Sequence, residues 1–215
     1  MKQKIPAAVI LISVFFMLSS CLGLKMDIAL NQNGSGTINL EYRISRSLDA
    51  LGRLDGNERW NTIPVGKADF DRTVDRLPDI KLTSFSSKED DKNLIINAKL
   101  DFTSIKGLLA FLDASGQRSS FSGDGRSGRL EFTLSEGDGD KSPELNELLA
   151  AISESYSVDI GMSFASDAVL NIKDNQGRII EAGNKITARG KKVSCSFPLY
   201  EILSSSRGIN VEVIW

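Results

Sequence analysis

The sequence predicts an α+β fold, in which an antiparallel β-sheet built from hairpins carries about three amphipathic helices packed on it. Three observations support this fold class. Apolar and polar residues alternate near both ends of residues 21–215, turn-forming residues join the alternating segments in pairs, and segments with helical spacing are inserted between the pairs. Because strands that recur through hairpins pair antiparallel, parallel βαβ winding is the less favoured arrangement.

The clearest hairpin comes first. Met26, Ile28 and Leu30 alternate with polar residues, an Asn33-Gly34 turn follows, and the alternation resumes over residues 38–44. Glycine adopts a positive φ at little cost, and period-two patterning buries one face of a sheet. A second hairpin is predicted over residues 80–102, with its charged turn at residues 88–92.

A short helix is predicted between these hairpins. Phe70, Val74 and Leu77 are spaced i, i+4 and i+7, which places them on one helical face. Pro78 then ends the helix, because proline lacks the backbone N–H that a continuing helix needs.

Two further helices are predicted later in the chain. Thr103 is expected to cap the first, whose apolar stripe runs from Ile105 to Leu112, with Gly116 shortly after its end. Ser142 is expected to cap the other, with Pro143 at the first helical position. Its buried face comprises Leu145, Leu148, Leu149, Ile152 and Tyr156.

The last third of the chain is again strand-like. Strands are expected within residues 158–173, near Ile179 and Ile186, over residues 192–197 and over residues 209–215, with a turn at residues 174–177 and one helical turn at residues 198–203. The glycine-rich segment 123–128 has no Lys-Ser/Thr ending, so it is interpreted as a mobile surface loop and not as a phosphate-binding loop.

Residues 1–20 are predicted to be a signal peptide. Lys2 and Lys4 precede an apolar run from Ile5 to Leu18, as in the charged and hydrophobic regions of export signals. The run is about fourteen residues long, whereas a transmembrane helix needs about twenty. Cleavage is therefore expected in preference to a permanent membrane span.

The cleavage region resembles the lipobox of bacterial lipoproteins. Leu18, Ser19 and Ser20 supply the aliphatic and two small residues before Cys21. The resemblance implies that the Cys21 thiol receives a diacylglyceryl group, that the chain is cut before Cys21, and that the new amine is acylated. Two or three chains hold a protein firmly, since each buried methylene contributes about 0.8 kcal/mol. The alternative is an ordinary secretory cleavage site with an incidental cysteine.

Processing would leave residues 21–215 as a single extracytoplasmic α+β domain, lipidated at residue 21, in the cell envelope. Leu22 is not the Asp that retains lipoproteins in the inner membrane of enteric-type bacteria, so an outer membrane is favoured where that sorting operates. Loss of Lys2 and Lys4 changes the formal net charge from −2 to −4. This charge gives no reason to expect nucleic acid as a partner, and lipid is expected to hold the domain at the membrane.

The amino-acid composition excludes several kinds of catalytic site. The chain has no histidine, which excludes Ser-His and Cys-His nucleophile pairs, and Cys195 is the one thiol left after lipidation. Cys195 shares a strand face with Val193 and Phe197, so a small buried hydrophobe is favoured over a reactive thiol. No metal site, cofactor or catalytic residue is predicted.

Acidic side chains are the remaining candidates for chemistry. Asp69, Asp71 and the run Glu89-Asp90-Asp91 could do acid-base work, but a charge run usually forms a solvated face. Carboxylates over residues 136–147 follow the spacing of a calcium loop, except that Lys141 occupies the position where glycine makes the turn. An acidic turn leading to the cap at Ser142 is favoured.

The order of these features resembles the LppM-like family of bacterial lipoproteins over most of residues 21–215. The shared features are a lipidated Cys21, an early hairpin at Asn33-Gly34-Ser35-Gly36, alternating strands and helices, the segment 197–203, and a closing strand that ends in Trp215. Family members often carry a transmembrane segment after this point, whereas here the amino-terminal lipid is expected to be the anchor. The resemblance implies an envelope-facing domain that contacts lipids or glycolipids, and it transfers no catalytic residue.

The sequence therefore favours a non-enzymatic lipid- or ligand-binding module of the cell envelope. In this interpretation the helices at 103–115 and 143–156 cover an apolar concavity on the sheet, and the simpler alternative is that their leucines fill a core. A structural or protein-interaction lipoprotein, or a surface antigen, is the other candidate. An enzyme using carboxylates alone ranks third, and a deep pocket with two acidic side chains would favour it.

Overall fold

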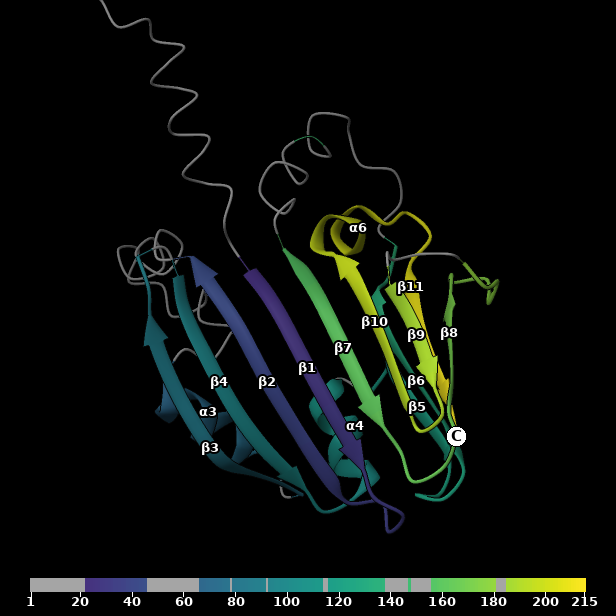
Figure 1. Cartoon of the computed structure of the whole chain (residues 1–215), viewed down its shortest axis with the longest axis horizontal. Helices are drawn as coiled ribbons and strands as arrows, with labels where there is room; N and C mark the ends of the chain where they lie inside the picture. Colours follow the sequence, from purple (N-terminus) through teal and green to yellow (C-terminus); the bar gives the residue numbers. More distant parts are fainter. Residues whose placement is uncertain are drawn as a thin grey trace, which may run out of the picture.

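The computed structural model describes residues 22–45, 66–77, 79–91, 93–113, 116–137, 147, 156–180 and 185–215. Over these residues the chain forms two β-sheets with three helices packed on them (Figure 1). The predicted α+β class is thus confirmed. The predicted signal peptide, Leu18, Ser19, Ser20 and Cys21 lie outside the described residues.

Seven strands form the larger sheet, called the large sheet here. Five of its six neighbouring strand pairs are antiparallel, and the sixth, β1 with β7, is parallel. In spatial order the strands are β3 (Ile80–Glu89), β4 (Asn93–Phe102), β2 (Gly36–Ser45), β1 (Leu22–Leu30), β7 (Ser157–Ser163), β10 (Lys192–Pro198) and β9 (Lys185–Arg189).

Four antiparallel strands form the small sheet, which lies behind one half of the large sheet (Figure 1). In spatial order they are β5 (Ser119–Gly123), β6 (Gly128–Ser135), β11 (Ile209–Ile214) and β8 (Val169–Lys173). The closing strand β11 leads to Trp215, whose ring stacks on Phe164 with the ring centroids 4.5 Å apart. This stack, together with backbone hydrogen bonds in both directions between Trp215 and Gly128, fixes the end of the closing strand.

Both predicted hairpins at the start of the domain are present. β1 and β2 pair in register from Leu22–Ile44 to Leu30–Gly36, and Gly34 in the turn has a φ of 81°. β3 and β4 form the second hairpin, with a register shift between Leu82 and Ser84. The parallel pairing of β1 with β7 joins segments far apart in the chain, so the hairpin pattern did not predict it.

The core lies between the inner face of the large sheet and a layer made by the small sheet and the helices. Leu100, Phe197 and Val213 are completely buried there, and they come from β4, β10 and β11. Full burial of such a side chain contributes about 1.5–3 kcal/mol relative to leaving it in water. Because side chains alternate along each strand, the opposite face of the large sheet is polar and faces solvent.

Helix α3 (Lys67–Val74) covers the β3 side of the large sheet. Phe70 and Val74 are buried as predicted, and the Phe70 ring contacts those of Tyr42 and Phe85, at centroid distances of 6.2 and 5.4 Å. The helix ends before Leu77, which packs against the core as a partly buried residue. Pro78, the predicted helix terminator, lies outside the described residues.

Helix α4 (Ile105–Leu112) also lies on the inner side, and its cap corrects the sequence prediction by one residue. The Ser104 hydroxyl, not that of Thr103, accepts the hydrogen bond from the Gly107 N–H, at 3.1 Å. The Thr103 hydroxyl is turned toward Asp79, and its backbone N–H donates to the Asp79 carbonyl. Helix α6 (Leu199–Ser204) is the short helical turn predicted before the closing strand.

Two other interpretations change. Segment 123–128, interpreted as a mobile loop, is the turn of the β5–β6 hairpin, and its Gly125 packs against another turn: an added Cβ there would lie 2.4 Å from the Gln32 carbonyl oxygen. Tyr156, predicted on a helix, is half-buried immediately before β7, and its carbonyl accepts a hydrogen bond from Leu199. The remainder of the helix predicted after Ser142 falls outside the described residues, except Glu147.

Candidate functional site

A groove on the polar outer face of the large sheet is the candidate site. It is built from two rows of side chains that cross the same five strands, β2, β1, β7, β10 and β9. The first, called the glycine row, runs through Asn39, Asp27, Gly161, Ser194 and Thr187. The second, called the lysine row, runs through Thr37, Ala29, Ser163, Lys192 and Arg189.

Small residues in the middle of both rows make the groove. Gly161 has no side chain, and Ser163 beside it on β7 has a short one, so the centre of the sheet lies lower than its flanks. The groove encloses about 510 Å³, within the size range of small-molecule sites. Its floor includes Ile28, Met162 and Val193, whose side chains are buried on the opposite face.

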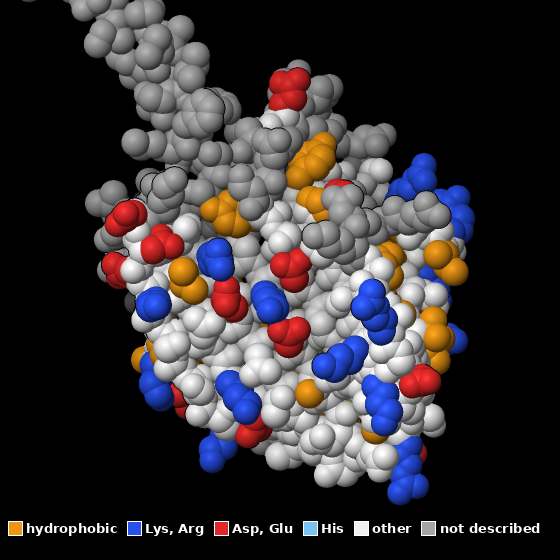
Figure 2. All heavy atoms as spheres, in the orientation of Figure 1, with side chains coloured by type: hydrophobic (Ala, Val, Ile, Leu, Met, Phe, Trp, Pro, Cys, Tyr) orange, Lys and Arg blue, Asp and Glu red, His pale blue; other side chains and the backbone are white. Residues whose placement is uncertain are grey.

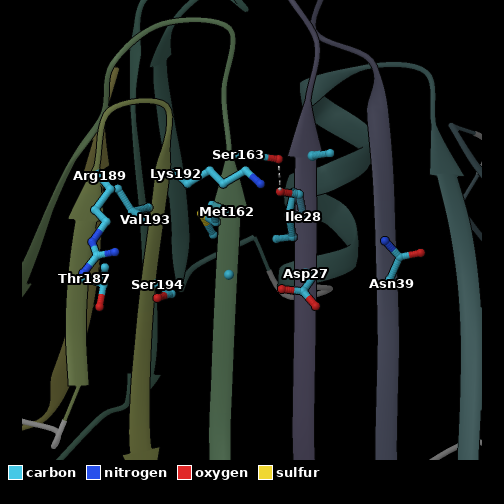
Figure 3. Close-up of a pocket in the computed structure, with 12 residues that line it drawn as sticks. Asp27, Ile28, Asn39, Met162, Ser163, Thr187, Arg189, Lys192, Val193 and Ser194 are labelled. Atoms are coloured by element: carbon cyan, nitrogen blue, oxygen red, sulfur yellow. Dashed lines mark hydrogen bonds between the residues drawn. The ribbon is translucent and has the colours of Figure 1, made fainter.

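Polar side chains of different character stand at the two sides of the groove (Figure 3). Arg189 and Thr187 lie on β9, Asp27 and Asn39 lie on β1 and β2, and Lys192 extends from β10 across β7 toward β1. The Ser163 hydroxyl makes a long hydrogen bond of 3.5 Å to the Ile28 carbonyl. The groove therefore offers one cation on β9, a second cation that reaches over its centre from β10, and a carboxylate with an amide on β1 and β2.

Around the groove, the acidic side chain has an ion-pair partner among the described residues and the two basic side chains do not. Asp27 pairs with Lys25 outside the groove, with 3.6 Å between Nζ and Oδ2, and Arg43 on the same face pairs with Glu41 at 3.1 Å. Arg189 and Lys192 have no ion pair with any carboxylate of the described residues. Over this face, Figure 2 shows Lys and Arg side chains gathered at the lower right, whereas both signs are mixed elsewhere.

A second hollow, of about 340 Å³, lies on the outer face of the small sheet and contains carboxylates. The Glu212 carboxylate is nearly inaccessible to solvent, and it accepts hydrogen bonds from Lys173 Nζ and Asn171 Nδ2, both at 2.7 Å. Burial acts to raise the pKa of Glu212, but these hydrogen bonds, with those from Lys173 first, hold it below its ordinary value. Glu212 is therefore a buried, ionised partner of the partly buried Lys173 and Asn171 side chains.

Asp174 in the same hollow is also held by its own surroundings. Its carboxylate accepts hydrogen bonds from the Arg178 side chain at 2.8 Å and from the backbone N–H groups of Gln176 and Arg178. The Arg178 side chain is the main cause that lowers the pKa of Asp174, and the backbone N–H groups add to it. Acid-base chemistry needs one carboxyl group with a raised pKa beside an ionised one, and Glu212 and Asp174 are both lowered.

Asp69, Asp71 and Asp90, three of the acidic residues considered in the sequence, have structural partners. Asp69 closes the start of α3 by accepting from the Gly66 N–H at 2.9 Å and pairs with Arg72, while Asp71 pairs with Lys67 at 2.7 Å. Asp90 accepts from the Asn93 N–H at the β3–β4 turn. Most of the calcium-like segment 136–147 lies outside the described residues.

The burial of side chains tests two further predictions, on Cys195 and on the leucines of α4. Cys195 is 3% exposed on the inner face of β10, as predicted, and burial is the main cause that raises its pKa to about 12. Leu108 of α4 is buried in the core, and Leu109 and Leu112 pack against the same cluster. For this helix the simpler alternative holds, since its leucines fill a core.

Within the described ranges, no cluster of three or more His, Cys, Asp or Glu residues has the arrangement needed to hold a metal ion. None of the helices described combines the length and the apolar character required to cross a bilayer.

The sequence prediction did not include the groove residues. One signal was available in the sequence. Apolar and polar residues alternate along β7, and Gly161 occupies one of the polar positions. A glycine inside a strand often marks a place where a ligand or another backbone comes close to the strand. The positions of Asp27, Ser194 and Lys192 around it depend on strand order, which the sequence did not provide.

Comparisons with known proteins yield no family for the chain. No protein-family model matches it, and no curated protein matches it. Among solved structures, it is similar to the NMR structure of the folded domain of LppM from Mycobacterium tuberculosis, with a TM-score of 0.47 and 12% identity over 92% of this chain and 91% of that chain.

A two-domain M1 zinc metallopeptidase, in a crystal structure with bound L-arginine, is also similar, with a TM-score of 0.25 and 10% identity over 90% of this chain and 42% of that chain. Both likenesses are distant, so function is inferred from the residues of this chain.

Proposed function

We propose that the protein is a lipoprotein of the bacterial cell envelope, anchored through Cys21, whose folded domain binds a ligand without transforming it. The lipobox at residues 18–21 supports the anchor. β1 begins at Leu22, so a lipid on Cys21 would be attached directly before the first strand.

This anchor would orient the domain. Neighbouring Cα atoms are about 3.8 Å apart, so the first residue of β1 would lie at the membrane surface. Asp27 and Ala29 in the groove are five and seven residues further along β1. At about 3.3 Å per strand residue, an upright domain would hold the groove roughly 17–23 Å above that point.

The groove around Gly161 is the observation that carries the binding function. On the outer face of the large sheet, five strands together leave a hollow lined by hydroxyl, amide and charged groups. Asp27 is the one carboxylate among the described residues that line it, so the groove offers contacts for binding and no paired acid and base.

Metabolic labelling with radioactive palmitate tests the anchor. Cells producing the full chain should label the wild type and the matched control Cys195→Ala, and labelling should disappear in Cys21→Ser, which should also leave the membrane fraction. If the wild type takes up no label, Cys21 is not lipidated and the proposed location is wrong.

Extraction of the purified full-length protein tests ligand binding. Compounds released into aqueous and organic solvent from the wild type would be identified by mass spectrometry and compared with those from Gly161→Val. A Cβ at position 161 would lie 2.3 Å from Asp27 Oδ1, so the flexible Asp27 side chain must turn away while the new side chain fills the groove.

Valine is favourable in strands, so Gly161→Val should stay folded. A compound depleted from this variant would support the groove as the binding site. Equal recovery from both proteins, or no compound from either, would contradict a ligand in the groove, and cross-linking in cells would then be used to look for a protein partner.

A further inference from the structure

We propose that the groove binds a soluble phosphate ester of a sugar or similar polyol. The phosphate would lie between Arg189 and Lys192, and the hydroxyl groups of the ligand would face Asp27 and Asn39. This inference rests on the proposed binding function, and it adds the chemical class of the ligand and its direction in the groove.

The two cations are the first observation. Arg189 and Lys192 occupy directly opposite positions in the β9–β10 pair, an arrangement that destabilises a sheet when the charges are alike. Asp167 lies near Gly190 at the tip of this hairpin, but it makes no ion pair with either cation. The Lys192 ammonium extends toward β1, away from the Arg189 guanidinium (Figure 3), so an anion lying between the two charged ends would be attracted by both.

Hydroxyl groups without partners are the second observation. Ser194 lies on β10 between the Arg189 side chain on one side and the Lys192 ammonium on the other (Figure 3), and Thr187 lies next to Arg189 on β9. Neither hydroxyl makes a hydrogen bond to another residue in the part of the chain that is described. Phosphate oxygens accept charge-assisted hydrogen bonds from such cations and further bonds from hydroxyl groups.

The end of the groove at Asp27 and Asn39 is suited to hydroxyl groups of a ligand. The Asp27 carboxylate and the Asn39 side chain are opposite each other on β1 and β2, and both can accept hydrogen bonds from hydroxyl groups. Asp27 on β1 is two strands away from Ser194 on β10, which corresponds to about 10 Å at a strand spacing of about 4.8 Å. A ligand that uses both ends must extend well beyond a bare phosphate.

Position favours a soluble ester over a lipid headgroup in the same membrane. The headgroup region adds only about 5–8 Å on each side of the hydrocarbon core. In an upright domain the groove lies roughly 17–23 Å from the start of β1, which is beyond that layer. A phospholipid that remains in the bilayer would not reach the groove.

Calorimetric titration of the detergent-solubilised full chain with glucose 1-phosphate tests the proposal, with glucose and inorganic phosphate as half-ligands. We expect both half-ligands to bind at least about tenfold more weakly. Lys192→Glu should weaken glucose 1-phosphate binding by at least about tenfold, while its melting temperature stays equal or rises, because a carboxylate now faces Arg189. Lys106→Glu on α4 makes the same charge change on the opposite side, and its binding should stay within about twofold.

Equal losses in Lys192→Glu and Lys106→Glu would overturn the proposal, because binding would then follow net charge alone. Sedimentation with vesicles of phosphatidylcholine and phosphatidylglycerol tests whether the phosphate ligand is a lipid headgroup instead. If the protein binds these vesicles, if Lys192→Glu abolishes that binding, and if glucose 1-phosphate does not displace the vesicles, the proposal of a soluble ester is overturned. If the wild type binds none of these probes while Gly161→Val still loses a co-purified compound, the phosphate class is wrong and the proposed binding function stands.

Discussion

The Cys195 thiol should be almost unreactive in the folded protein. It is 3% exposed on the inner face of β10, and burial, with a smaller contribution from the nearby Asp159 carboxylate, raises its pKa from an ordinary value of 9.0 to about 12. The thiolate is the reactive form. At about pH 8 the thiolate fraction therefore falls from roughly one in ten to roughly one in ten thousand, a loss of about a thousandfold in reaction rate before steric protection is included.

Reaction with Ellman's reagent measures this loss and reports on Cys21 as well. The folded full chain from membranes should react at least about a thousandfold more slowly than the same protein in concentrated guanidinium chloride. In denaturant the reagent should detect one thiol per chain in the wild type, because Cys21 is blocked as a thioether, and it should detect none in Cys195→Ala. Two thiols in the denatured wild type would show that Cys21 is free.

A fast thiol in the folded wild type that disappears in Cys195→Ala would refute the reasoning about burial. The same pKa shift has a consequence for stability. The folded state keeps the proton up to about pH 12, whereas the unfolded state releases it from about pH 9. The contribution to the free energy of unfolding is therefore complete below pH 9.0 and decreases by at most about 1.4 kcal/mol per pH unit above it, relative to Cys195→Ala.

Two further predictions concern the core and the small sheet. Phe197→Ala removes a fully buried ring and should lower the free energy of unfolding by about 3–5 kcal/mol in urea denaturation; a loss below about 1 kcal/mol would contradict the packing. Glu212→Gln should lower it by about 1–3 kcal/mol at neutral pH, because Lys173 loses a charged partner. Since the pKa of Glu212 is held below 4.5, this difference should shrink as the pH falls through that region, and a pH-independent difference would show that the charge is not involved.

Local pattern was sufficient for elements that form from neighbouring residues. The alternation through Met26–Leu30 and the Asn33-Gly34 turn predicted the first hairpin, because side-chain direction in a strand repeats every two residues and the turn sets the register. The same alternation placed Cys195 on the buried face of β10. The cap of α4 was displaced by one residue because Thr103 and Ser104 are both able to cap. Both hydroxyls donate to Asp79, and the Ser104 hydroxyl is the one that also accepts from the Gly107 N–H.

Turns that pack on other turns were not predictable in this way. The segment 123–128 has the composition of a free loop, yet Gly125 lies against the backbone of residues 31–34. Gly125 therefore reflects the close approach of two backbones. The partner is distant in the chain, so composition alone favoured the wrong interpretation.

The anchor and the groove differ in how they are encoded. A modification signal such as residues 18–21 is recognised as a linear segment, so the expectation of a lipid on Cys21 follows from the sequence alone. The groove required the tertiary structure, because the parallel pairing of β1 with β7 and the register of β10 bring Asp27, Gly161 and Ser194 into one row. Periodicity determines which face of a strand a residue occupies, but the neighbours across the sheet are chosen by the packing of the whole core.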